Sequence, residues 1–177
     1  MSDPRAAAAL RVILGGVVQV LFVCTGNICR SPLAEAIFTH YVRQAGLEGR
    51  YVVDSAGLDG WHEGEPADPR TCHVGGRHGI AVPSIARRFQ AADFERFDVI
   101  LAMDRGHLAA LRSRAPAAHR DKIRLMRDYD SPENHGRDVP DPYYGGPDGF
   151  ESMYRMLAVS CRRLLDALEE RTGRAHP

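Results

Sequence analysis

Residues 20–32 read Val20-Leu21-Phe22-Val23-Cys24-Thr25-Gly26-Asn27-Ile28-Cys29-Arg30-Ser31-Pro32, and the rest of the chain is best understood from this segment. The apolar run from Val17 to Val23 is typical of a buried parallel strand. The run stops at Cys24, a short glycine-containing turn follows, and Ser31-Pro32 opens a helical pattern. We therefore predict a strand, a loop and a helix N-terminus. A thiol lies at the loop entrance and a guanidinium at its exit.

This arrangement is suited to binding and attacking an oxyanion. The first turn of a helix offers unpaired N–H groups and the positive end of a dipole. Successive N–H groups in a loop form an anion-binding nest, and Arg30 can donate two parallel hydrogen bonds to a tetrahedral oxyanion. The same positive field favours the thiolate form of Cys24. A thiolate beneath a bound phosphate is a nucleophile aimed at phosphorus.

The remaining chain alternates predicted helices and strands without a linker or repeat. Hydrophobic spacing and turn residues predict helices at 32–45, 69–78, 105–111 and 150–171, with strands at 51–56, 97–103 and 122–126. A polar loop is predicted at 129–149. This alternation predicts a single doubly wound α/β domain with a central four-stranded parallel sheet flanked by helices. In this architecture ligands bind at the carboxyl ends of the strands, where Cys24 falls.

Composition limits the classes of function. The 177 residues are enough for one domain with a sizeable core, and Lys+Arg and Asp+Glu are both 23, so the formal net charge is zero. We expect no nucleic acid or membrane partner, because there is no basic patch and no long uncharged apolar run. The predicted boundaries are a disordered N-terminal tail at 1–9, the domain at 10–172 and a C-terminal tail at 173–177.

The cysteines and histidines predict neither disulfides nor a metal. The four cysteines form no secreted disulfide ladder, and a reactive thiolate fits a reducing cytoplasm better. The eight histidines show no metal-ligand spacing. We therefore expect a cytoplasmic protein without metal or other cofactor.

The motif Cys-x5-Arg-Ser at Cys24, Arg30 and Ser31 is the phosphate-binding loop of cysteine-based phosphatases. The longer string from Val23 to Ala36 resembles the low-molecular-weight protein tyrosine phosphatase family, and the resemblance extends from about Val17 to Arg171. It implies that Cys24 is the nucleophile and Arg30 the phosphate ligand. It also implies a phosphate-binding loop that contains Thr25, Gly26, Asn27, Ile28, Cys29 and Ser31.

The second half of the chemistry is predicted in the late polar loop. A phenolate leaving group needs an acid, which then serves as the base for the water that cleaves the phosphocysteine. The family carries this acid in Asp-Pro-Tyr-Tyr, which the resemblance places at Asp141, with Tyr143 and Tyr144 as an aromatic wall. Asp, Pro and Gly are also ordinary turn residues, and Asp138 is a nearby carboxylate outside the motif.

The resemblance also suggests residues that support the loop. It implies that Ser31 hydrogen-bonds the thiolate, although an N-cap role is the simpler alternative. It implies a left-handed conformation for Asn27, with Ser55 steadying it. Where mammalian members carry a histidine linked to this asparagine, this chain has Ser84, which leaves open how firmly Asn27 is held.

Two other residues, Trp61 and Cys29, have two interpretations each. Trp61, with His62 beside it, is predicted to flank the substrate ring, although core packing is the usual fate of a lone tryptophan. Cys29 matches a family cysteine that can form a reversible disulfide with the nucleophile; its simpler role is that of a small apolar loop residue. Cys72 and Cys161 are predicted to be structural.

The predicted function is hydrolysis of phosphotyrosine in proteins through a phosphocysteine on Cys24. Ile28 and the two tyrosines favour an aryl phosphate, whereas family members acting on phosphoarginine carry threonine at the place of Ile28. A thiol-linked arsenate reductase needs a further cysteine pair, and a pure phosphate-binding module would need neither Cys24 nor Asp141. Expected partners are phosphotyrosine-containing proteins, a cognate tyrosine kinase among them, and the expected assembly is a monomer or weak dimer.

Overall fold

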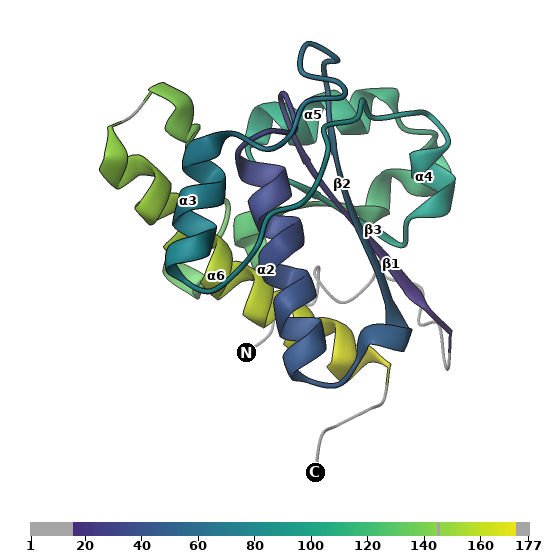
Figure 1. Cartoon of the computed structure of the whole chain (residues 1–177). Coiled ribbons are helices and arrows are strands. Elements are labelled where there is room, and N and C mark those ends of the chain that lie inside the picture. Colours follow the sequence, from purple (N-terminus) through teal and green to yellow (C-terminus); the bar gives the residue numbers. More distant parts are fainter. Residues whose placement is uncertain (1–15, 145, 173–177) are drawn as a thin grey trace.

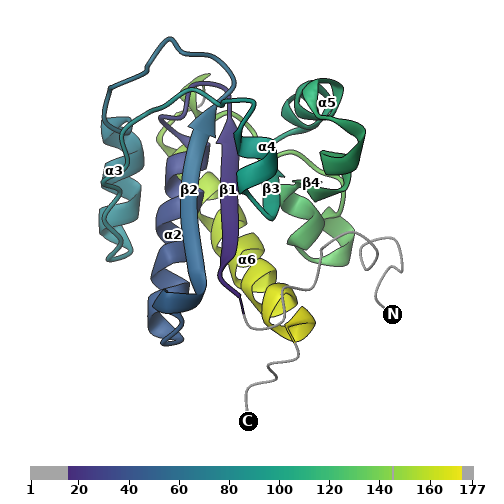
Figure 2. The same ribbon diagram turned by 90° about the vertical axis from the view of Figure 1, so that its right-hand side faces the viewer.

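The computed structural model describes residues 16–144 and 146–172. The predicted tails at 1–9 and 173–177, and the first residues of the predicted domain, lie outside this part of the chain. The described residues form a parallel sheet of four strands in the order β2-β1-β3-β4, so the predicted fold class is confirmed. The strands are β1 (Val18–Cys24), β2 (Tyr51–Gly57), β3 (Val99–Ala102) and β4 (Ile123–Leu125). Figures 1 and 2 show β1 near the middle of the sheet.

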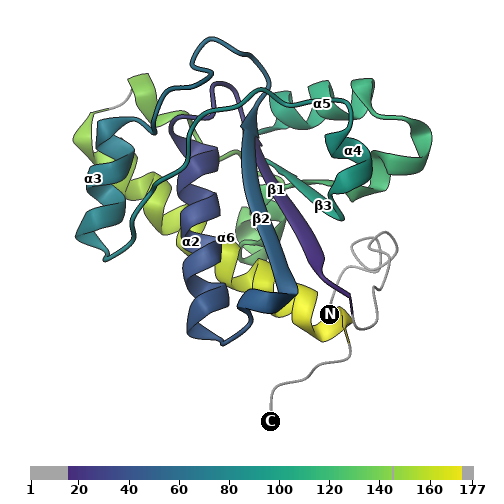
Figure 3. The same cartoon turned by 45° about the vertical axis from the view of Figure 1, so that its right-hand side comes forward.

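Helices cover both faces of the sheet, as Figures 1 and 3 show. One face carries α2 (Arg30–Gln44), α3 (Pro69–Arg77) and α6 (Pro147–Arg171), while the other carries α4 (Asp93–Arg96) and α5 (Arg105–Arg114). Because both faces are covered, β1 lies between two apolar clusters, and the residues from Val20 to Val23 are fully buried. This explains why its sequence is a continuous apolar run rather than an alternating one.

Several predicted boundaries differ from the structure by a few residues. The third strand was predicted to begin at Phe97, but Phe97 caps the unpredicted short helix α4 and packs into the core, so β3 begins at Val99. The last helix begins at Pro147 rather than Phe150, since proline is well suited to a first helical turn. The predicted loop at 129–149 contains two short 3₁₀ turns, at 132–134 and 142–144.

Helix α6 packs its predicted apolar face against α2. The six residues of that face are all buried: Met153, Leu157, Cys161, Leu164, Leu165 and Leu168. The Cys161 thiol lies 3.6 Å from the backbone oxygen of Ala34 on α2. Burial raises the pKa of this thiol, so Cys161 is a core residue, as predicted.

Glu35 of α2 is a partly buried carboxyl close to a second acidic residue. Burial, followed by the nearby charge of Asp54, raises the pKa of Glu35 to about 7. Because this exceeds the unfolded value, the folded state holds the proton more tightly than the unfolded chain does. The stabilisation is therefore complete below about pH 4.5 and is lost as the pH rises towards 7.

We expect Glu35→Gln to stabilise the protein at neutral and alkaline pH. Glutamine keeps the shape and hydrogen-bonding capacity of the protonated acid but cannot ionise. The variant should gain about 1 to 3 kcal/mol in unfolding free energy at about pH 8, and little at about pH 4. Urea unfolding at both pH values measures this difference. The control is Glu170→Gln, at an exposed position of α6; an equal gain for Glu35→Gln at both pH values would contradict the prediction.

Candidate active site

The loop of residues 24–30 connects the carboxyl end of β1 to the N-terminus of α2. Helix α2 begins at Arg30, two residues before the predicted start at Pro32, and Cys29 occupies the N-cap position without a side-chain cap. Ser31 therefore lies inside the first turn, and the N-cap alternative for this residue is wrong. Its hydroxyl is used elsewhere.

The hydroxyl of Ser31 lies between the thiol of Cys24 and the amide of Asn27. Its Oγ is 3.0 Å from Cys24 Sγ and accepts a hydrogen bond of 2.8 Å from Asn27 Nδ2. The hydrogen of the Ser31 hydroxyl can be directed at the sulfur or, at 3.5 Å, at the backbone oxygen of Ala56.

Asn27 has φ +57°, a left-handed conformation that only a minority of non-glycine residues adopt. Three side-chain hydrogen bonds hold it there. Nδ2 donates to Ser31 and to Ser55 (2.9 Å), while Oδ1 accepts from the backbone N–H of Arg87 (3.0 Å). None of these bonds uses Ser84, and both ends of the Asn27 amide are bonded without it.

The end of β2 supports the loop from one side through a glycine. A Cβ at Gly57 would lie 2.8 Å from the backbone oxygen of Thr25 and 3.0 Å from the carbonyl carbon of Gly26. A side chain here would push the loop away, because real Cβ contacts are longer. The next two residues donate backbone hydrogen bonds to the loop, Leu58 to Cys24 O and Asp59 to Thr25 O.

Arg30 is 3 % exposed, and its guanidinium is held by residues far away in the sequence. Nη1 donates to Asp104 Oδ2 (2.9 Å) and to the backbone oxygen of Val139 (3.1 Å). Nη2 lies 3.5 Å from Thr25 Oγ1 and 3.7 Å from Asp141 Oδ2. Nη1 is thus anchored by two hydrogen bonds, and Nη2 lies near Thr25 and Asp141, which line the same cavity as Arg30.

The two late aspartates have different surroundings. Asp141 lines the cavity beside Arg30, and its Oδ1 also accepts from the backbone N–H of Tyr143 (3.0 Å). Asp138 instead accepts three hydrogen bonds from Arg105. Although burial acts in the opposite direction, this partner holds the pKa of Asp138 below its usual range. Asp138 is therefore committed to an ion pair, while Asp141 faces the loop.

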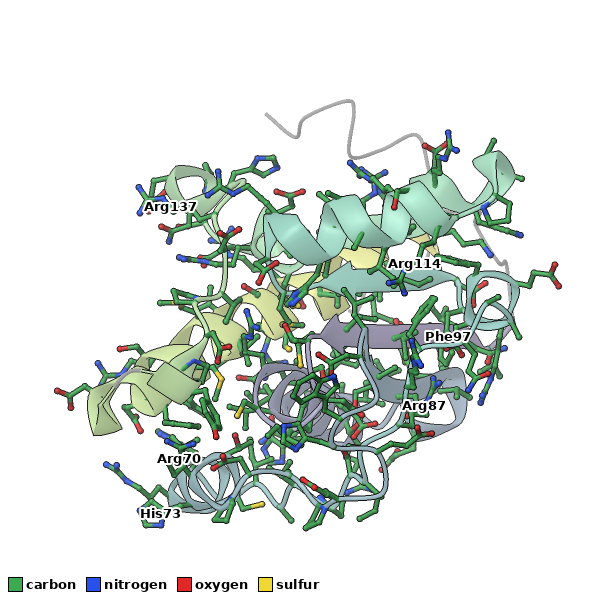
Figure 4. All side chains as sticks on the ribbon, turned by 90° about the horizontal axis from the view of Figure 1, so that it is seen from above. Arg70, His73, Arg87, Phe97, Arg114 and Arg137 are labelled. Carbon is green, nitrogen blue, oxygen red and sulfur yellow. The ribbon has the colours of Figure 1, made fainter. Side chains whose placement is uncertain are left out.

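A cavity of about 370 Å³ opens above the loop. Its walls are formed by Cys24, Thr25, Gly26, Ile28, Cys29, Arg30, Asp59, Trp61, His62, Asp141 and Tyr143. Trp61 is 87 % exposed, so the core-packing alternative is wrong, and the indole stands on the rim. The Tyr143 ring lies 5.1 Å from the guanidinium of Arg70, which projects from α3 in Figure 4. The Tyr144 side chain lies outside the described part of the structure.

These features define a loop that presents a buried thiol, a guanidinium and a carboxylate to one cavity. A family model described as low molecular weight phosphotyrosine protein phosphatase matches residues 19–174. This chain belongs to that family. A Streptomyces coelicolor relative, "Low molecular weight protein-tyrosine-phosphatase", is 53 % identical over 161 residues, covering 89 % of this chain and 98 % of the relative.

Solved structures of the family resemble the whole domain. A protein tyrosine phosphatase from Entamoeba histolytica matches with a TM-score of 0.83 and 42 % identity, covering 86 % of this chain and 97 % of that one. A drosophila arginine phosphatase matches with a TM-score of 0.75 and 36 % identity, covering 84 % and 96 %. Proteins named tyrosine phosphatase and arginine phosphatase therefore both share this fold.

Some residues of the site were not predicted from the sequence. Asp104 caps helix α5 by accepting from the backbone N–H of His107, and its other oxygen holds Arg30. It follows the carboxyl end of β3, which pairs with β1, so its place at the same sheet edge as Cys24 was the available signal. Val139 and His107 gave no comparable signal in the sequence.

Cys29 is part of the loop, lines the cavity and is 5 % exposed. Burial, with a smaller contribution from the charge of Asp68, raises the pKa of Cys29 to about 12. This residue is therefore a protonated thiol at neutral pH, which is the poorly nucleophilic form of cysteine.

In the part of the chain that the structure describes, no helix is both long enough and apolar enough to cross a bilayer.

Proposed function

We propose that this protein is a phosphotyrosine-protein phosphatase that works through a phosphocysteine on Cys24. The observation that carries the proposal is the convergence of Cys24, Arg30 and Asp141 on one cavity at the N-terminus of α2. Anion-binding N–H groups, a nucleophilic sulfur and a proton donor are the three parts that phosphomonoester cleavage requires.

The first step transfers the phosphoryl group to the protein. The Cys24 thiolate attacks phosphorus, so an S–P bond forms while the bond from phosphorus to the tyrosyl oxygen breaks. Arg30 and the N–H groups of the loop from Thr25 to Cys29 stabilise the equatorial oxygens. Asp141 donates its proton to the departing tyrosyl oxygen.

The second step returns the protein to its starting state. Asp141, now a carboxylate, takes a proton from a water molecule that attacks phosphorus. The S–P bond breaks, inorganic phosphate leaves and Cys24 is again a thiolate. The hydroxyl of Ser31, 3.0 Å from the sulfur, stabilises the thiolate as it departs.

The cavity favours an aromatic phosphate ester over phosphoarginine. The apolar Ile28 lines the cavity and Trp61 and Tyr143 stand at its mouth, so the walls suit a flat ring better than a charged guanidinium. We assign Tyr144 to the same wall. The proposed substrates are phosphotyrosine-containing proteins, with a cognate tyrosine kinase among them, and the proposed setting is the cytoplasm, where the protein acts as a monomer or weak dimer.

Arsenate reduction is the weaker alternative on this scaffold. It requires cysteines that pass a disulfide from the nucleophile to the surface. Cys161 is fully buried in the core, and the Cys72 thiol lies against the backbone oxygens of Ala67 and Val82. Neither residue lines the cavity.

The test is a comparison of phosphate release from a phosphotyrosyl peptide and from the same peptide carrying phosphoarginine. We expect release from phosphotyrosine to be preferred and to depend on Cys24, with Cys24→Ser as the control. A preference for phosphoarginine would contradict the assignment of Ile28 and the aromatic rim. No release from either substrate would contradict the proposal as a whole, and arsenate would be the next substrate to test.

A further inference from the structure

His107 is a buried histidine that contacts the residue following the nucleophile. It lies in the first turn of α5 and is 5 % exposed. Its Nε2 is 2.8 Å from Oγ1 of Thr25, and its Nδ1 is 3.2 Å from Oδ1 of Asp104. Since Asp104 holds Arg30 and Arg30 reaches Thr25, the four side chains close a ring around one side of the loop.

We propose that His107 is a positioning residue that orients the hydroxyl of Thr25 and, through it, the phosphate-facing nitrogen of Arg30. The inference rests on the proposed function for the identity of the bound group, an oxyanion of phosphorus. The ring joins, in order, the imidazole of His107, the hydroxyl of Thr25, the guanidinium of Arg30 and the carboxylate of Asp104. Each group restricts the orientation of its neighbour.

The charges around the ring determine which nitrogen carries the hydrogen. Nδ1 lies 3.2 Å from the Asp104 carboxylate but makes no hydrogen bond of good geometry. A hydrogen on Nδ1 is nevertheless favoured, because a lone pair there would be repelled by the nearby negative charge, and this tautomer leaves Nε2 as an acceptor. Thr25 must then donate its hydroxyl hydrogen to Nε2, at 2.8 Å.

The imidazole is kept neutral by its surroundings. Its charged neighbours are Asp104, Arg30, Asp141 and Asp138, three acids and one base. Burial nevertheless dominates and, with the charge of Arg30, lowers the pKa of His107 to about 4. A neutral acceptor at Nε2 is therefore present throughout the neutral pH range.

The orientation of Thr25 has a consequence for Arg30. With its hydrogen directed at His107, the hydroxyl of Thr25 offers a lone pair to Nη2, which lies 3.5 Å away. Nη1 is already held by Asp104 and Val139. Both ends of the guanidinium fork are then constrained before phosphate arrives. Without the acceptor at Nε2, the Thr25 hydroxyl is free to turn, and Nη2 loses its partner in the loop.

The test uses two amides of different length in place of the imidazole. In His107→Asn the amide ends near the former Nδ1 and cannot reach Thr25, whereas in His107→Gln it extends to the former Nε2. We expect His107→Asn to weaken inorganic phosphate binding and kcat/KM for an aryl phosphate by about tenfold, and His107→Gln by less than about threefold. Calorimetry of inorganic phosphate gives a readout that needs no turnover.

The same pair in a Thr25→Val background separates positioning from packing. If His107 acts through the Thr25 hydroxyl, the His107→Asn and His107→Gln variants should have equal phosphate affinity and equal kcat/KM in the Thr25→Val background. The proposal is overturned if the two variants still differ in phosphate affinity in the Thr25→Val background. It is also overturned if they have the same phosphate affinity in the parent protein.

If His107→Asn does not fold, Thr25→Val and Thr25→Ser test the same contact. We expect the serine variant to keep its phosphate affinity and the valine variant to lose it. If phosphate affinity changes as expected but the parent protein hydrolyses no aryl phosphate, the proposed function is contradicted and the role of His107 is still supported.

Discussion

Replacement of Cys24 by serine is expected to lower the turnover of an aryl phosphate by at least about four orders of magnitude. Serine keeps the size of the side chain, but its hydroxyl remains protonated at neutral pH and no base is placed to activate it. Ser31, whose hydroxyl lies 3.0 Å from the Cys24 sulfur, is not a base at neutral pH. The change therefore removes the nucleophile and leaves the anion site intact.

Two measurements isolate this effect. Steady-state release of phosphate gives the loss in kcat, and binding of inorganic phosphate by calorimetry should change by less than about fivefold, because Arg30 and the loop N–H groups remain. The matched control is Cys72→Ser, which alters a partly buried thiol outside the cavity. Turnover of Cys24→Ser within tenfold of the parent protein would rule out a phosphocysteine on this residue.

Replacement of Asp141 by asparagine is expected to reduce kcat by about two to three orders of magnitude for phosphotyrosine. Asparagine preserves the shape beside Arg30 and an acceptor for the Tyr143 N–H, but it cannot donate a proton to the leaving oxygen. The loss should depend on the leaving group. It should be much smaller for p-nitrophenyl phosphate, whose phenolate departs without protonation.

Asp138→Asn is the matched control, because this carboxylate lies three residues earlier in the same loop. Its partner is Arg105, and the pair is largely exposed, so kcat should stay within about threefold of the parent value. The general acid would be another residue if Asp138→Asn lowered kcat as much as Asp141→Asn or more. The same conclusion would follow if the loss of kcat in Asp141→Asn did not depend on the leaving group.

The Glu35 and His107 predictions concern opposite effects of burial on ionisable groups. Burial raises the pKa of Glu35 and lowers that of His107, because in both cases it disfavours the charged form. Protonation of His107 costs stability as the pH falls from about 6.5 to about 4, whereas ionisation of Glu35 costs stability as the pH rises from about 4.5 to about 7. The two groups therefore make the free energy of unfolding change with pH in opposite directions, so single variants are needed to reveal each effect.

The structure of the loop could be predicted because its functional residues are close together in the sequence. A buried strand, a turn and a helix start follow one another within residues 20–32, so the thiol, the loop N–H groups and Arg30 are brought together by local backbone geometry. The alternation of strands and helices was equally local in origin, and it placed Cys24 at the ligand-binding edge of the sheet. Asp141 was a different case: it was predicted through family resemblance, since neither spacing nor composition distinguishes it from Asp138.

Tertiary structure alone decided which distant groups complete the site. Strand order brings β3 beside β1, and only then does Asp104 meet Arg30 and His107 meet Thr25, across 74 and 82 residues of chain. The ion pair between Asp138 and Arg105 was likewise invisible in the sequence. The physical reason is that a sequence pattern encodes contacts along one strand or helix. Contacts between elements depend on strand order, register and burial, which arise only when the whole chain packs.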